Sequence, residues 1–112
     1  MVTTEYVRKL ALSMEEAQML AHFELISFRI NKKIFATLDL KNKRACLMLR
    51  PEDQSAFCAL DPEVIYPVPK RSPKGATCIE LRKVRKDLFE DALTAAYCKA
   101  APKKLAEKYE RK

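Results

Sequence analysis

The sequence contains one glycine, no tryptophan and one histidine. Because Gly75 is the single glycine, a glycine-rich loop that cradles phosphates, as in nucleotide-binding proteins, is excluded. No stretch approaches the ~20 consecutive apolar residues that span a bilayer, and the first residues lack the basic stretch and apolar core of a secretory signal. We therefore expect a cytoplasmic protein that is not a membrane protein.

Motifs of catalysis and metal binding are also lacking. There is no Gly-x-Ser-x-Gly, His-Glu-x-x-His or Walker sequence. The cysteines stand at 46, 58, 78 and 98, two in predicted strands and two in predicted helices, without a Cys-x-x-Cys pair. This spacing favours buried reduced thiols over a disulfide framework or a zinc site. We expect a protein that is not an enzyme and carries no cofactor.

The 112 residues fit one domain, taken here as 1–112. The charge is uneven along them. The chain carries 22 Lys and Arg against 15 Asp and Glu, a net charge of +7. Residues 1–40 are neutral, so the whole excess lies beyond residue 40. A polyanion is the natural partner for this asymmetry, although a net charge of this size also serves solubility alone.

A β-meander is predicted over residues 26–49. Side chains alternate between apolar and polar with a period of two over 26–30 and 34–38, which indicates half-buried strands. The predicted buried sets are Ile26, Phe28 and Ile30, then Ile34, Ala36 and Leu38. Asn31-Lys32 is a two-residue hairpin signal, and Lys41-Asn42-Lys43 leads into a third strand, 44–49.

Helices are predicted before and after this meander in the sequence. The first is Thr4 to Ser13, capped by Thr3 or Thr4. The second begins at Pro51 and has a predicted buried stripe of Ala56, Phe57 and Leu60. The third begins near Asp87, which forms a predicted capping pair with Glu90, and ends before Pro102, which can open a last short helix.

Two other segments complete the predicted order of elements. Residues 14–20 fit either a helical turn or an irregular connector, and 77–81 is predicted to be a strand after a proline-rich loop. The predicted class is α+β, with an antiparallel sheet of a three-stranded meander plus one or two further strands packed against helices.

Short matches in a fixed order resemble one known family. They are His22-Phe23-Glu24, Ser27-Phe28-Arg29-Ile30, Lys33-Ile34-Phe35-Ala36-Thr37-Leu38, Tyr66-Pro67-Val68-Pro69, Gly75, Ala96-Tyr97 and Ala101-Pro102-Lys103-Lys104-Leu105. As an ordered set they resemble the MmcQ/YjbR family of small bacterial proteins. The resemblance implies a CyaY-like or secretion-chaperone-like α+β domain, with a DNA-binding role through a "double wing" of hairpin and loop.

The chain departs from the family pattern at one place. The family commonly has tryptophans around the second loop, in a Trp-Gly…Gly-Trp-Thr pattern. Here Gly75 and Thr77 fit that pattern, but Ala76 replaces the aromatic residue. If the family uses that ring to stack on a ligand or base, this chain cannot do so. If the ring only packs in the protein, a small cavity or a local shift compensates for its loss.

Basic residues at turns and loops form the predicted DNA-binding set. It comprises Lys32, Lys33, Lys41, Lys43, Arg44, Lys70, Arg71, Lys74, Arg82 and Lys83. A meander puts the turns at 31–32 and 41–42 at opposite ends of its second strand, so the first five form two patches. Such cations bind backbone phosphates without reading bases. The partner is therefore predicted to be DNA, bound with little sequence preference, and a monomer is the favoured state.

Two other residues, His22 and Arg29, are candidates for a site. His22 beside Phe23 is more often a packed or capping residue than a ligand. Arg29 either pairs with a buried carboxylate or faces solvent. Two other functions remain open: a protein-interaction module, which an exposed apolar patch would favour, and a small-ligand pocket between sheet and helices near His22 and Arg29.

Overall fold

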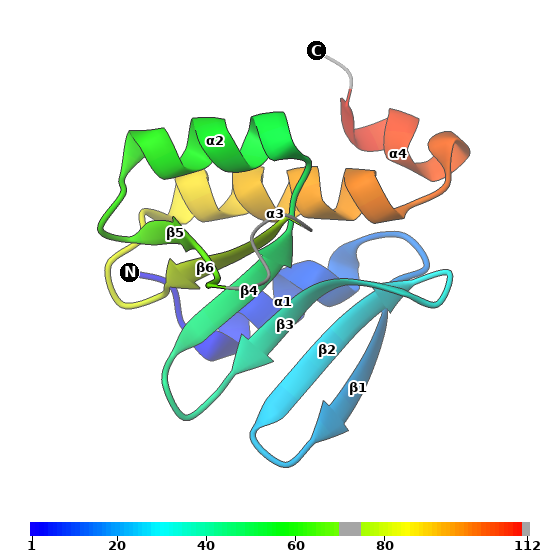
Figure 1. Ribbon diagram of the computed structural model, residues 1–112. Helices are drawn as coiled ribbons and strands as arrows, with labels where there is room; N and C mark the ends of the chain where they lie inside the picture. Colours follow the sequence, from blue (N-terminus) through cyan, green and yellow to red (C-terminus); the bar gives the residue numbers. More distant parts are fainter. Residues whose placement is uncertain (70–74, 111–112) are drawn as a thin grey trace.

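The computed structural model describes residues 1–69 and 75–110, which form four helices and six strands (Figure 1). In chain order these are α1 (Thr4–Ser13), β1 (Gln18–His22), β2 (Leu25–Ile30), β3 (Lys33–Asp39), β4 (Arg44–Met48), α2 (Pro51–Leu60), β5 (Ile65–Pro67), β6 (Ala76–Glu80), α3 (Lys86–Ala100) and α4 (Lys103–Glu110). The strands form one antiparallel sheet in the order β1-β2-β3-β4-β6-β5. The predicted α+β class and the meander are confirmed.

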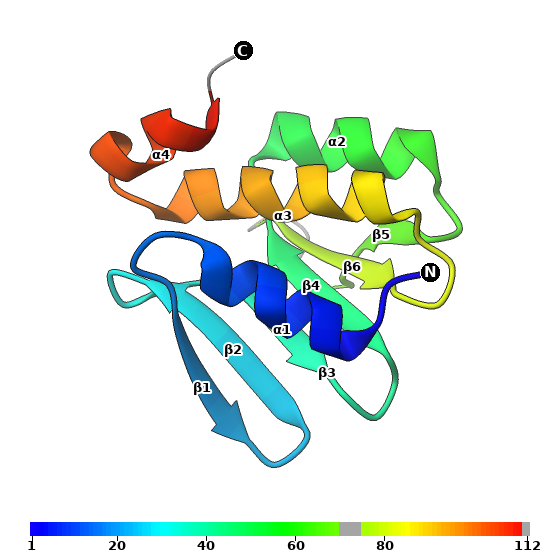
Figure 2. The same cartoon turned by 180° about the vertical axis from the view of Figure 1, so that it is seen from behind.

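The helices leave one face of the sheet open. Helices α1 and α3 lie on one face, as Figure 2 shows from their side, and Figure 1 shows the sheet from the other. Helix α2 contacts β5, and α4 packs against α3. The side chains between α1, α3 and the sheet form the core, and Phe28, Leu38, Leu47 and Phe89 in it are fully buried. Within the part of the chain that the structure describes, no helix covers the opposite face.

The hairpin between β2 and β3 has the predicted two-residue turn. Asn31 and Lys32 have φ angles of 54° and 71°. Positive φ at both central residues is the type I′ arrangement, whose twist matches that of the flanking strands. The sequence signal therefore fixed the register at this end of the hairpin, where Ile30 pairs with Lys33.

Strand β1 was not predicted. From residue 18 the expected helical turn or connector is wrong, because Gln18–His22 pairs with β2 instead. All five residues of β1 are exposed, since this edge strand has a neighbour on one side only and no helix covers it. A strand without a buried face carries no alternation for a pattern to detect.

A β-bulge at the start of β3 changes which side chains face the core there, compared with the prediction. Phe28 pairs with Ala36, whereas Arg29 pairs with Ile34, so Phe35 is an extra residue between them. The extra residue turns the phenyl ring of Phe35 into the core, where it is fully buried, and leaves the side chain of Ile34 40% exposed. The predicted burial of Ile34 is therefore wrong, and that of Ala36 and Leu38 is confirmed.

Two predictions about helices are also wrong. Helix α2 has no buried residue: Ala56 is exposed, the Leu60 side chain is 67% exposed and Phe57 is half-buried, because α2 lies beside the sheet edge. Helix α3 begins after Arg85 and has no side-chain cap; Asp87 pairs with Arg85 instead of capping. Helix α3 is the longest helix of the described residues and is well buried.

Tyr97 on α3 ties the core to the segment after α1. Its ring is fully buried and lies edge to face with the rings of Phe35 and Tyr109. Its hydroxyl donates a hydrogen bond of 2.6 Å to the backbone carbonyl of Glu15. Burial raises the pKa of this hydroxyl to about 12, so it stays a donor at neutral pH.

We expect Tyr97→Phe to lower the free energy of unfolding by about 1 kcal/mol, because it removes one hydrogen bond and keeps the ring. Urea unfolding followed by circular dichroism measures the change. Tyr109→Phe is the matched control, since the Tyr109 hydroxyl accepts a hydrogen bond from the exposed backbone N–H of Glu15. Equal stability of Tyr97→Phe and the wild type would contradict the prediction.

Candidate nucleic-acid interface

Five of the predicted DNA-binding residues meet at one end of the sheet. Lys41 and Lys43 lie in the turn between β3 and β4, and Arg44 begins β4. Arg82 and Lys83 lie just after β6, separated from its last residue by Leu81. The two segments adjoin because β4 and β6 are paired and the backbone N–H of Leu81 donates to the carbonyl of Lys43 over 3.0 Å. These residues, Lys41, Lys43, Arg44, Arg82 and Lys83, are called the basic end below.

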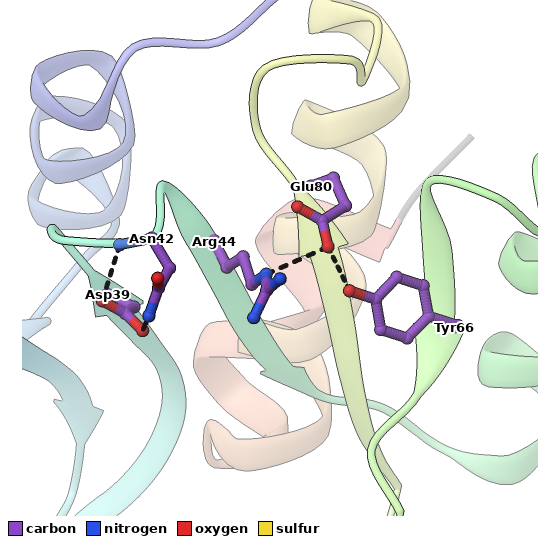
Figure 3. A network of polar contacts seen from close by, with 5 residues as sticks. All are labelled: Asp39, Asn42, Arg44, Tyr66 and Glu80. Carbon is purple, nitrogen blue, oxygen red and sulfur yellow. Dashed lines mark hydrogen bonds and ion pairs between the residues drawn. The ribbon is translucent and has the colours of Figure 1, made fainter.

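Within the basic end, Arg44 is held by a carboxylate. Its Nε lies 3.0 Å from Oε2 of Glu80, and the hydroxyl of Tyr66 donates to the same oxygen (Figure 3). The Glu80 carboxylate raises the pKa of Arg44, and burial together with the bond to Glu80 raises that of Tyr66. Arg44 is thus partly neutralised and held over the sheet.

The turn that carries Lys41 and Lys43 is held by Asp39. The backbone N–H of Asn42 donates to Asp39 Oδ1 over 3.1 Å, and its side-chain amide donates to Oδ2 over 2.8 Å (Figure 3). These hydrogen bonds from Asn42 lower the pKa of Asp39. Lys43 has a φ of 56°, which closes the turn. The two lysines therefore stand on an ordered turn.

The other four cations of the basic end are exposed and without acidic partners. Among residues 1–69 and 75–110, Lys41, Lys43, Arg82 and Lys83 form no ion pair. The next cation along the chain, Arg85, does, because its guanidinium lies 2.6 Å from Asp87. The basic end thus presents four exposed positive charges that are not paired with any carboxylate of the described residues.

Lys32 and Lys33 lie at the opposite end of the sheet. The strand between the two ends, β3, is seven residues long, so they are separated by roughly 20 Å at ~3.3 Å per residue. The predicted division into two patches is thus confirmed by the register. Lys70, Arg71 and Lys74 lie outside the described residues. Of the described cations in the predicted set, only Lys32 and Lys33 are absent from the basic end.

The open face of the sheet forms a shallow groove of about 630 Å³. His22 and Arg29 line it, so a pocket near these residues exists, but on the side of the sheet away from α1 and α3 instead of between sheet and helices. Its walls are largely apolar; the side chains of Leu20, Leu25 and Ile34 in it are 56%, 53% and 40% exposed. Phe23, in the β1–β2 turn, is 90% exposed but does not line the groove.

The two remaining candidate residues, Arg29 and His22, contact neighbouring side chains of the protein. Arg29 donates to the hydroxyl of Ser27 over 3.5 Å and forms no ion pair within the described residues. His22 lies edge to face with Phe23, with ring centroids 4.6 Å apart. Across the described ranges, no three His, Cys, Asp or Glu side chains are grouped to hold a metal ion. None of the described helices is both long and apolar enough to cross a bilayer.

The cysteines lie in the predicted elements but are less buried than predicted. Cys98 on α3 is buried, whereas Cys46, Cys58 and Cys78 are half-buried. Cys46 is on β4 and Cys78 on β6, and both side chains line the open-face groove. The expectation of four buried thiols is therefore wrong for three of them, because two belong to the face that no helix covers.

Two comparisons relate the chain to other proteins. The YjbR family model matches residues 12–99. The crystal structure of a Deinococcus radiodurans protein with a DUF419 domain superimposes with a TM-score of 0.78. That similarity covers 97% of this chain and 88% of the other at 19% sequence identity, so the two share a fold. No curated protein matches the chain in sequence.

Proposed function

The chain belongs to the YjbR family, and from this premise we propose that it is a non-enzymatic DNA-binding protein. It binds the backbone phosphates of duplex DNA through the basic end, with little sequence preference. This is the role that the family resemblance implies, with the contact surface assigned to one end of the sheet instead of being spread over both.

One observation carries the proposal: four exposed cations, which form no ion pair with any described residue, come together from two distant parts of the chain. Lys41 and Lys43 come from one turn, and Arg82 and Lys83 from the segment after β6. Phosphate contacts need positive charge at fixed positions and carry no base information. Arg44 is less suited to such a contact, because Glu80 already holds its guanidinium.

Hydrogen bonds hold the turns at the basic end in a fixed conformation. Asp39 and Asn42 fix the β3–β4 turn, and the bond from Leu81 to Lys43 ties it to the segment after β6. A preformed set of cations gives up little conformational freedom on binding, which favours affinity. Lysine side chains still adapt to the spacing of phosphates, as binding without sequence preference requires.

We expect the protein to bind a duplex oligonucleotide with an affinity that falls steeply with salt. Four phosphate contacts predict a slope of about −3.6 in log K against log salt concentration, hence a loss of roughly tenfold when the salt is doubled. Fluorescence anisotropy with two duplexes of unrelated sequence measures both the slope and the sequence preference. The proposal would be refuted if no binding were seen at low salt, or if the affinity did not change with salt concentration.

A second function is favoured by the open face. Three exposed leucine and isoleucine side chains line its groove, and β1 leaves one backbone edge unpaired within the described sheet. These features suit an extended apolar segment of a partner protein, which would add a strand to β1. This module would show salt-insensitive binding to protein and none to DNA, so the same anisotropy experiment separates the two functions.

A further inference from the structure

Two cysteines face each other across the middle of the sheet. Cys46 on β4 is the direct register partner of Cys78 on β6. Partners in an antiparallel pair project their side chains from the same face. Here that face is the open one, because both cysteines line its groove. The two thiols therefore lie side by side where small molecules can reach them.

The backbone hydrogen bonds identify the kind of pair they form. The N–H of Leu81 donates to the carbonyl of Lys43 over 3.0 Å, and that of Leu49 donates to the carbonyl of Gly75 over 2.9 Å. Both bonds join residues in the same register as the β4–β6 ladder. Hydrogen-bonded and non-hydrogen-bonded pairs alternate along such a ladder. The pair of Cys46 and Cys78 lies three positions along the ladder from each of these two hydrogen-bonded pairs. An odd number of positions makes it a non-hydrogen-bonded pair.

That position has the spacing of a disulfide. Opposite residues in a non-hydrogen-bonded pair have Cα atoms about 4.5 Å apart, and disulfides join Cα atoms roughly 4.4–6.8 Å apart. The strands need no large movement to bring the two sulfur atoms together. Because the spacing is at the short end of the range, the bond would be strained and readily reduced.

We propose that Cys46 and Cys78 are a redox modification site, which closes to an intramolecular disulfide by exchange with a low-molecular-weight disulfide, RSSR. The thiolate of one cysteine attacks a sulfur of RSSR, releases RS⁻ and forms a mixed disulfide. The thiolate of the other then attacks the cysteine sulfur of that bond and releases the second RS⁻. The protein loses two electrons and two protons, and RSSR becomes two RSH.

The surroundings of Cys78 bear on the rate of this exchange. Burial raises the pKa of its thiol, against the opposing effect of the hydrogen bond with Tyr66. Glu80 and Arg44 lie on the same face and act in opposite directions, the first raising and the second lowering that pKa. The thiolate fraction at neutral pH is therefore small, and the exchange is best followed at about pH 8.5, near the ordinary pKa of a thiol.

The test uses the full chain with Cys58→Ser and Cys98→Ser, which leaves only the proposed pair. After incubation with glutathione disulfide, we expect the loss of both titratable thiols, an intact mass lower by two hydrogens, and full recovery with dithiothreitol. Because the bond closes a loop from 46 to 78, the Tm should rise by about 10 °C. Cys46→Ser in the same background should instead retain one glutathionyl group on Cys78.

Two outcomes with the variant that lacks Cys58 and Cys98 would overturn the proposal. One is a protein that keeps both thiols, or carries two glutathionyl groups, after exhaustive oxidation. The other is a disulfide that joins two chains, seen as a dimer on a non-reducing gel. As a check on the serine substitutions, the wild type should give the same 46–78 peptide link by mass spectrometry; a link to Cys58 or Cys98 would equally count against the pair.

Discussion

Gly75→Ala is expected to lower the free energy of unfolding by at least about 3 kcal/mol, with a Tm about 15 °C lower. Gly75 has a φ of +90°, a conformation that residues with a Cβ rarely adopt. A Cβ added there would lie 2.0 Å from the backbone carbonyl oxygen of Leu49. The backbone atoms of Leu49 cannot rotate away from this contact as the end of a flexible side chain could. Thermal and urea unfolding followed by circular dichroism measure the loss.

A matched control separates the two causes of this loss. Asn31 has a φ of 54° but is exposed at a hairpin tip, so Asn31→Ala introduces the strain of positive φ without the contact with Leu49. We expect a cost of about 1–2 kcal/mol for it. If Gly75→Ala cost no more than Asn31→Ala, the close approach between Gly75 and Leu49 would be disproved.

The contacts of Gly75 explain why the single glycine of the sequence lies at this position. Its carbonyl accepts a hydrogen bond of 2.9 Å from the N–H of Leu49, so the residue both opens β6 and closes the β4–β6 ladder. Thr77 follows as the one buried polar residue among those described; its hydroxyl donates to the carbonyl of Gly75 and accepts from Gln54. These contacts give a structural reason for the two residues that match the family pattern.

Local signals made much of the fold predictable from sequence. Thr3 caps α1 through a 3.0 Å bond from the N–H of Tyr6, and Pro51 opens α2 as predicted. Both signals act within one helical turn. By contrast, the bulge at Phe35 depends on how two strands are paired, and an insertion of one residue inverts the faces beyond it. Alternation alone cannot locate such an insertion.

The candidate site was only partly predictable, for a related reason. The sequence identifies Lys41 and Lys43 as one group and Arg82 and Lys83 as another. Their convergence depends on the pairing of β4 with β6, which joins segments about forty residues apart. The bond from Tyr66 to Glu80 likewise needs β5 beside β6. No local pattern encodes non-local pairing, so neither arrangement could be predicted from composition or periodicity.

Replacing Lys41, Lys43, Arg82 and Lys83 together with glutamine is expected to weaken duplex binding at least about 100-fold at low salt. The salt slope should fall by about 3.6, because four phosphate contacts and their released counterions are lost. All four side chains are exposed and form no ion pair within the described residues, so stability should change little. Anisotropy titrations across a range of salt concentrations give both quantities.

Net charge alone would weaken DNA binding too, so the decisive control removes the same charge elsewhere. Lys9, Lys99, Lys103 and Lys104 are also exposed, and their replacement with glutamine lowers the net charge equally. We expect this variant to keep most of the affinity and the slope of the wild type. A further variant, Lys32→Gln with Lys33→Gln, examines the other end of the sheet. Equal losses in the two fourfold variants would mean that DNA responds to overall charge and that the basic end is no binding site; a loss confined to Lys32 and Lys33 would move the site to the β2–β3 turn.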